Sequence, residues 1–145
     1  MTAQSLTARA VNLLARREHS QTELRTKLLK AEFDINEIND VLDKLAAKDI
    51  QSDTRFAENY IRYRAQRGYG SQKINIELKE RGVDKQTIVN AIEEAEIDWF
   101  DLAISARRKR FGEQVPDNIK DRAKQQRFLQ YRGFTHEQIN ESFNI

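Results

Sequence analysis

The side chains with the clearest chemical potential in this sequence are clustered cations. Residues 106–112 read ARRKRFG and hold four consecutive cations, although the chain of 145 residues has a formal net charge of only +2. Such a run can bind an anion, or it can be a solvated helix surface whose cations suit a helix C-terminus. Consecutive helical residues point about 100° apart, so at most two of the four cations can share one direction. The run alone leaves both interpretations open.

A second group alternates cations with aromatic rings between residues 60 and 69. Its members are Arg62, Arg64 and Arg67 with Tyr60, Tyr63 and Tyr69. This pattern suits single-stranded nucleic acid, because guanidinium groups hold phosphates while rings stack on bases. The same arginines can instead pair with acidic side chains of a protein partner. Phe56, Tyr60 and Tyr63 keep helical spacing, so we expect these three rings in the core and leave Tyr69 open.

Catalytic and metal-binding patterns are weak. Residues 68–71 (GYGS) precede a predicted helix and could cradle a phosphate, but they lack the Lys-Ser/Thr pair of a P-loop. A helix end followed by a Ser cap explains them more simply. His19 and His136 are the only histidines, and neither has a partner at ligand spacing. The sequence therefore predicts a protein that is not an enzyme and has no catalytic residues, cofactor or metal.

Composition limits the class of protein. Hydrophobic residues make up 39% and charged residues 33%, with five Gly, one Pro and no Cys. Few turn-forming residues favour an all-helical chain, and the absence of Cys fits a reducing compartment. The N-terminal residues do not resemble a signal peptide, and no apolar run approaches the ~20 residues that span a bilayer. We expect a cytoplasmic protein with no membrane partner.

The elements that must position these groups follow an internal repeat. The stretches 27–42, 77–92 and 128–143 each place four apolar residues 5, 5 and 4 positions apart. Their offsets of 50 and 51 residues indicate three similar units. A repeat of this length made of helical patterns predicts stacked supersecondary units that share a core.

Each copy contains a helix end and a helix start. The cap residues are Asp34, Asp84 and Thr135. Glu37 and Gln138 follow two of these caps by three residues, and Ser20 has Glu23 at the same spacing, which is the capping-box arrangement. Each cap is worth roughly 1 kcal/mol.

These signals predict an all-α fold of three tandem three-helix repeats that form a short curved solenoid-like array. Gly82 and Gly133 supply the left-handed turn that ends a helix in two repeats. The expected helices cover residues 6–18, 21–31, 35–48, 54–66, 72–81, 85–96, 98–110, 117–131 and 136–144. We expect a single elongated domain at 1–145, with repeats at 1–52, 53–97 and 98–145.

Charge is nearly balanced over the chain but not over its helices. Residues 55–73 have a net charge of +4 and residues 107–132 of +6. Residues 34–49 have a net charge of −3 and residues 84–98 of −4. If the repeats stack in parallel, the first helices build a basic side and the third helices an acidic side.

Three further stretches are ARREHSQTEL at 15–24, the segment 53–83 and KQQRFLQYRGF at 124–134. They resemble the RecX family, regulators of the RecA recombinase, and the resemblance extends over nearly the whole chain. The sequence departs from the family at 50–53, where Ile-Gln-Ser-Asp replaces an aromatic-Leu-Asp-Asp run. The resemblance implies three three-helix units, no catalytic motif, and binding in the groove of RecA nucleoprotein filaments. It further implies limits on filament extension, ATP hydrolysis and strand exchange, within DNA recombination, DNA repair and the SOS response.

We therefore expect a monomeric regulator whose partners are the RecA filament and possibly single-stranded DNA. One alternative is a general single-stranded DNA-binding protein that acts indirectly on recombination, and another is a helical scaffold. The net charge of +2 disfavours strong independent DNA binding, since affinity grows with the number of phosphates neutralised. The candidate RecA or DNA contacts are Arg55, Arg62, Arg64, Arg67, Lys73, Arg107, Arg108, Arg110, Lys120, Lys124, Arg127 and Arg132.

Overall fold

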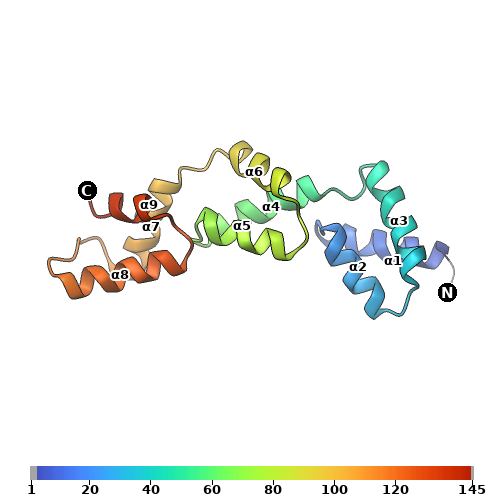
Figure 1. Ribbon diagram of the computed structural model, residues 1–145, viewed down its shortest axis with the longest axis horizontal. Helices are drawn as coiled ribbons and strands as arrows, with labels where there is room; N and C mark the ends of the chain where they lie inside the picture. Colours follow the sequence, from blue (N-terminus) through green and yellow to red (C-terminus); the bar gives the residue numbers. More distant parts are fainter. Residues whose placement is uncertain (1–2, 145) are drawn as a thin grey trace. The chain divides into compact units, whose positions relative to one another are not determined.

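The computed structural model describes residues 3–144, and every regular element in that part is an α-helix (Figure 1). The predicted all-α class with three-helix repeats is confirmed, and the predicted helix ends differ from the observed ones by three residues at most. The helices are α1 Ala3–Arg16, α2 Gln21–Lys30, α3 Ile35–Ala47, α4 Asp53–Gln66, α5 Ser71–Glu80, α6 Lys85–Glu94, α7 Trp99–Phe111, α8 Ile119–Tyr131 and α9 His136–Glu141. No helix in this range is both long and apolar enough to cross a membrane.

The chain forms two compact units, each of which combines two stretches of sequence. The first contains residues up to 59 together with 78–91, and the second contains 60–77 together with the residues from 92 onward. The division passes through α4 and α5.

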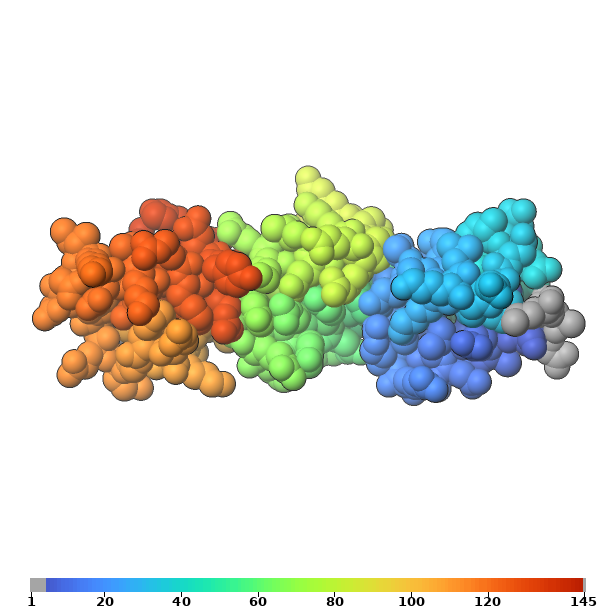
Figure 2. All heavy atoms as spheres, turned by 90° about the horizontal axis from the view of Figure 1, so that it is seen from below, coloured from blue at the N-terminus to red at the C-terminus, as the bar shows by residue number. Residues whose placement is uncertain are grey.

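The first unit is built on the packing of α1, α2 and α3. On α3 the buried residues are Ile38, Val41, Leu42 and Leu45, which lie on one face of the helix. They share a core with the buried residues of α1 and α2, and the atoms of the three helices pack closely in Figure 2. The core residues from outside α3 are Leu6, Ala10, Leu24, Leu28 and Phe33.

The second unit is built on α7, α8 and α9, which contact one another in pairs. Its core contains the buried residues Ala103, Ala106, Leu129, Phe134, Ile139 and Phe143. Phe128 packs against this core and meets Phe111 edge to face, with ring centroids 5.3 Å apart.

The helix starts agree with the predicted caps in most places. Ser20 and Thr135 make complete capping boxes, in which the side chain at the third helical position bonds back to the cap. The Asp34 carboxylate accepts from two backbone N–H groups, but Glu37 does not complete a box there. Helix α8 starts two residues later than predicted, because Asn118 is its cap.

In each unit, the N-terminus of one helix meets the end of α5 or α8 at a joint. At the first joint, the Ser20 hydroxyl donates to the carbonyl of Arg81 over 2.7 Å. Gly82 has a φ of +80°, and a Cβ at this position would lie 2.0 Å from the Thr22 hydroxyl oxygen. The chain therefore needs glycine here for both its backbone conformation and the close approach of α2.

The second joint repeats this arrangement 51 residues further along the chain. The backbone N–H of Gly70 donates to the carbonyl of Arg132 over 2.7 Å, and that of Gln72 donates to the carbonyl of Gly133 over 3.0 Å. Gly133 has a φ of +96°, and a Cβ there would lie 2.4 Å from the Cβ of Lys73. The contact between positions 22 and 82 thus recurs between positions 73 and 133.

Candidate anion-binding surface

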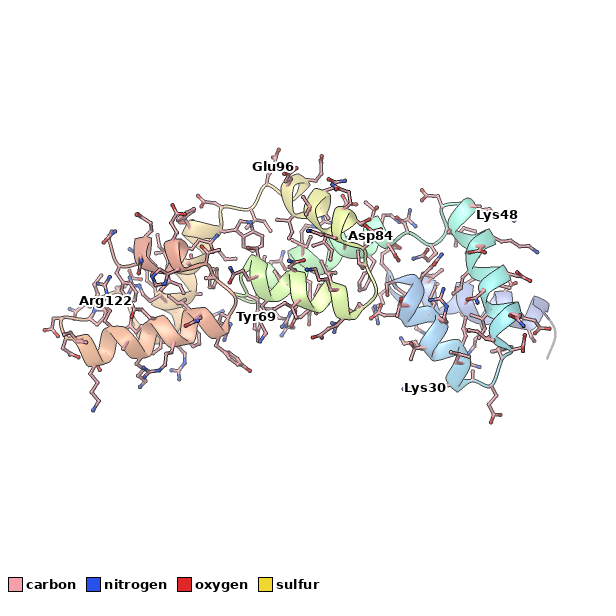
Figure 3. The ribbon with its side chains drawn as sticks, in the orientation of Figure 1. Lys30, Lys48, Tyr69, Asp84, Glu96 and Arg122 are labelled. Atoms are coloured by element: carbon pink, nitrogen blue, oxygen red, sulfur yellow. The ribbon has the colours of Figure 1, made fainter. Side chains whose placement is uncertain are left out.

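Tyr69 lies at the centre of a group of cations in the second unit. Figure 3 shows it where α5 begins, beside the segment that follows α8. The guanidinium carbon of Arg64 lies 3.7 Å from the centroid of its ring, and that of Arg132 lies 4.6 Å away. The Lys73 ammonium lies 5.7 Å from the same centroid. Each of these distances suits a cation–π interaction, so one ring holds three cations together.

Arg64 is the member of this group whose charge is neutralised. Its guanidinium donates to both carboxylate oxygens of Glu77, over 2.9 and 2.8 Å, and the hydroxyl of Tyr60 donates to the same carboxylate over 3.0 Å. Burial lowers the pKa of Arg64, but the hydrogen bond and charge of Glu77 outweigh it, so the pKa is raised overall. We interpret Arg64 as the residue that positions Tyr69.

Arg132 lies between two aromatic rings. Its guanidinium carbon is 4.8 Å from the centroid of Phe128, in addition to its contact with Tyr69. One of its nitrogens, Nη1, donates to the carbonyl of Arg67 over 3.0 Å, which connects the ends of α8 and α4. The guanidinium is therefore held in place by two rings and a carbonyl rather than by a carboxylate.

Lys73 extends the group toward an exposed ring. Its ammonium lies 4.2 Å from the ring centroid of Tyr131, which is 74% exposed at the end of α8. Lys73 thus contacts Tyr69 on one side and Tyr131 on the other. An exposed aromatic ring beside a cation can stack on a flat ligand group.

A hollow of about 360 Å³ lies next to Arg132. Its cationic lining residues are Arg67, which follows α4, Lys109 and Arg110 on α7, and Arg132, which follows α8. The remaining lining residues are Gln66, Gly68, Leu102, Ser105, Ala106 and Phe128. Because Leu102, Ala106 and Phe128 are buried or half-buried while Arg67, Lys109 and Arg110 are exposed, we interpret the apolar residues as the floor and the cations as the rim.

We call the exposed and half-buried residues of this region the Tyr69 surface. It comprises Arg67, Tyr69, Lys73, Lys109, Arg110, Tyr131 and Arg132. Within residues 3–144, none of its five cations has a carboxylate within 4.0 Å. A surface with several unneutralised cations and two aromatic rings favours an anionic ligand.

The ARRKRFG run does not act as one group, and the candidate contact Arg107 is corrected by the structure. Arg107 is fully buried, where its Nε donates to the carbonyl of Ser142 over 3.1 Å and its Nη1 to that of Gln114 over 3.4 Å. Burial lowers its pKa, and the charge of Arg108 acts in the same direction. Arg107 therefore connects α7 to the chain around α9 and is not available to a partner.

The other cations of the run have different surroundings. Arg108 lies 3.4 Å from the carboxylate of Glu113, so its charge is partly compensated. Lys109 and Arg110 are exposed and line the hollow. Two of the four cations thus line one hollow, although as neighbours on α7 they point about 100° apart.

The remaining predicted contacts lie outside the Tyr69 surface. Arg55 belongs to the first unit, where Glu18 and Asp49 lie 2.9 and 3.1 Å from its guanidinium. The hydrogen bond to Glu18 is the main cause of its raised pKa. None of the other four candidates lines the hollow, and all four are exposed: Arg62 on α4, and Lys120, Lys124 and Arg127 on α8.

The sequence did not single out Lys109 or Tyr131 as contact residues. Tyr131 precedes Arg132 at the end of α8, so an aromatic residue next to a cation at a helix end was the available signal. Lys109 had only its place in the cationic run. Among residues 3–144, no three His, Asp or Glu side chains are grouped so that they could hold a metal ion.

Comparison with known proteins gives matches along nearly the whole chain. Models of the first, second and third three-helix domains of RecX match residues 8–45, 52–92 and 96–142. A regulatory protein RecX from Pectobacterium atrosepticum is 38% identical, over 90% of each chain. One from Halorhodospira halophila is 42% identical, over 90% of this chain and 81% of the relative.

Two solved structures share the fold. The crystal structure of RecX from Lactobacillus salivarius superimposes with a TM-score of 0.82 at 19% identity, over 98% of this chain and 94% of that one. A crystal structure of a regulatory protein RecX gives a TM-score of 0.84 at 20% identity, over 98% of this chain and 72% of that one.

Proposed function

Because the chain belongs to the RecX family of regulatory proteins, we propose that it binds RecA nucleoprotein filaments and limits their extension, ATP hydrolysis and strand exchange. The Tyr69 surface is the observation that connects this proposed function with particular residues. Its five cations have no carboxylate partner within the described chain, and a nucleoprotein filament offers both phosphates and acidic side chains.

The proposed mechanism is steric. One chain touches more than one protomer in the filament groove and so obstructs the addition or rearrangement of protomers. The basic residues of the first helices face DNA or acidic parts of RecA. The acidic residues at 34–49 and 84–98, all exposed, face solvent or basic parts of RecA. The protein acts as a monomer in the cytoplasm, without catalysis or a cofactor.

A general single-stranded DNA-binding protein is the alternative from another class. Affinity for single strands falls with salt by a slope of roughly −0.7 per neutralised phosphate, so five cations give a steep dependence and weak binding at physiological salt. Tight binding to naked strands at physiological salt, with no preference for RecA-coated strands, would favour this alternative.

The test compares two double variants that remove the same charge. Arg67→Ala with Arg110→Ala removes two cations of the Tyr69 surface, whereas Lys79→Ala with Lys85→Ala removes two exposed cations elsewhere. The assay is the rate of RecA ATP hydrolysis on single-stranded DNA against the concentration of the variant. Since a hydrogen bond to a charged group contributes about 1.5–3 kcal/mol, the first variant should need at least about tenfold more protein for half-inhibition.

The control variant should inhibit as the natural chain does, and both should retain their thermal unfolding midpoints. Equal inhibition by the two variants would remove the Tyr69 surface from the proposed function. Loss of inhibition in both would show that net charge matters rather than this surface.

A further inference from the structure

We propose that the hollow in the Tyr69 surface binds one nucleotide unit of a single-stranded nucleic acid, with the base in the hollow and the neighbouring phosphate at its rim. This inference rests on the proposed function, because a nucleoprotein filament carries such a strand. It assigns the surface to the nucleic acid of the filament rather than to its protein.

The floor of the hollow suits a flat apolar group. Leu102 and Ala106 from α7 and the ring of Phe128 from α8 supply apolar surface beneath the cations. The volume of about 360 Å³ lies within the range of small-molecule pockets, about 300–1,000 Å³. Every base has a π-face that packs on apolar and aromatic side chains, whereas the carboxylates of an acidic peptide are polar and gain nothing from an apolar floor.

The wall of the hollow carries groups that can bond to the edge of a base. Gln66 supplies an amide and Ser105 a hydroxyl, and both side chains are exposed. Neither has a hydrogen-bond partner elsewhere in the described chain. An amide and a hydroxyl each provide a donor and an acceptor, so they accept different bases without strong sequence preference.

The rim suits a phosphate. Arg132 uses Nη1 for the carbonyl of Arg67, and its other guanidinium N–H groups have no acceptor within residues 3–144. The guanidinium of Arg110 lies 5.9 Å from the ring centroid of Phe128, at the edge of the apolar floor. Arginine binds phosphate oxygens through its planar fork of donors, so Arg110 and Arg132 flank a suitable anion position.

The exposed ring of Tyr131 favours a strand over a free nucleotide. Lys73 contacts both Tyr131 and Tyr69, and Tyr69 contacts Arg132 at the rim. A second ring beside a second cation can stack on the next base and hold the next phosphate. A single nucleotide would leave this pair unused.

The test measures the affinity for two fluorescent strands of equal length, an oligothymidylate and an abasic strand with the same phosphates, by anisotropy at low ionic strength. The natural chain should bind the oligothymidylate about tenfold more tightly, the ratio expected from one stacked base. Ser105→Phe fills the hollow from an exposed position and should lower this preference severalfold, to what stacking on Tyr131 alone provides, while leaving the affinity for the abasic strand unchanged. Thr54→Phe is the matched control, because it adds the same ring at an exposed position on α4 that does not line the hollow, and it should keep the preference.

Equal affinity of the natural chain for the two strands overturns the proposal, and this result does not depend on whether any variant folds. A preference that Ser105→Phe leaves undiminished also overturns it. Displacement of the strand by an equal nucleotide concentration of thymidine monophosphate would assign the hollow to a free nucleotide. Displacement by polyglutamate as effective as that by oligothymidylate would assign it to an acidic peptide. None of these results bears on inhibition by the Arg67 and Arg110 variant, which tests the proposed function separately.

Discussion

Replacement of Gly133 by alanine should destabilise the protein more than the same replacement at Gly112. The two glycines have nearly equal φ values, +96° and +93°. An alanine in this part of conformational space costs about 1–3 kcal/mol at either position. The surroundings differ, because a Cβ at Gly112 meets no atom within 4 Å, whereas at Gly133 it lies 2.4 and 2.5 Å from the Cβ and N of Lys73.

The clash at Gly133 involves backbone, so it cannot be relieved by rotation of a side chain. The second joint must open, and the two hydrogen bonds that close it, from Gly70 to Arg132 and from Gln72 to Gly133, are lost or lengthened. Each such bond contributes about 0.5–1.5 kcal/mol. Gly133→Ala should therefore cost about 1–3 kcal/mol more than Gly112→Ala.

Urea unfolding followed by circular dichroism measures this difference. With a slope of about 2 kcal/mol per molar urea, the two variants should differ in midpoint by roughly 0.5–1.5 M. Equal midpoints would refute the reasoning, because they would show that the close approach at the joint contributes nothing beyond backbone strain. A difference of opposite sign would refute it as well.

Two further predictions concern buried basic residues. His19 is buried, its Nδ1 donates to the carbonyl of Arg17 and its Nε2 accepts from Lys27, so its pKa is lowered chiefly by burial. Neutral His19 therefore stabilises the fold above its unfolded pKa of about 6.5, and this contribution is lost as the pH falls through the lowered pKa. Urea midpoints should fall with acidification in the natural chain and fall less steeply in His19→Gln. Equal slopes of urea midpoint against pH in the two proteins would contradict this prediction. Arg107→Ala should lower the free energy of unfolding by about 2–4 kcal/mol and leave the proposed inhibition of RecA ATP hydrolysis by the folded protein unchanged. Arg110→Ala should leave the free energy of unfolding unchanged and weaken that inhibition. Unchanged urea stability of Arg107→Ala would show that the buried guanidinium does not support the fold.

Helix positions could be predicted from local sequence because caps act over three or four residues. Thr135 with Gln138 is an example, since the cap and its reciprocal partner lie within one turn. The burial of Arg107 could not be predicted in this way. Its acceptors are backbone carbonyls of Ser142 and Gln114, which α9 and the loop after α7 bring to it, and backbone carbonyls leave no trace in residue type.

The sequence indicated which residue types contribute to the candidate site, but not which of these residues lie close together in space. The arginines and Tyr69 were apparent from their types, yet Arg64 is neutralised by Glu77, which lies 13 positions away in the sequence. The hollow depends on α7, α8 and the end of α4 meeting in space, so its floor has no local pattern. Burial and partner choice are tertiary properties, and they decide which cations remain available.

Arg132 takes part in both the second joint and the rim of the hollow. Its carbonyl closes the second joint while its guanidinium lies at the rim of the hollow. A ligand that draws the guanidinium outward pulls on the same residue that fastens one three-helix repeat to the next. The affinity for the ligand and the rigidity of the second joint thus both depend on Arg132, so a substitution at this position changes both.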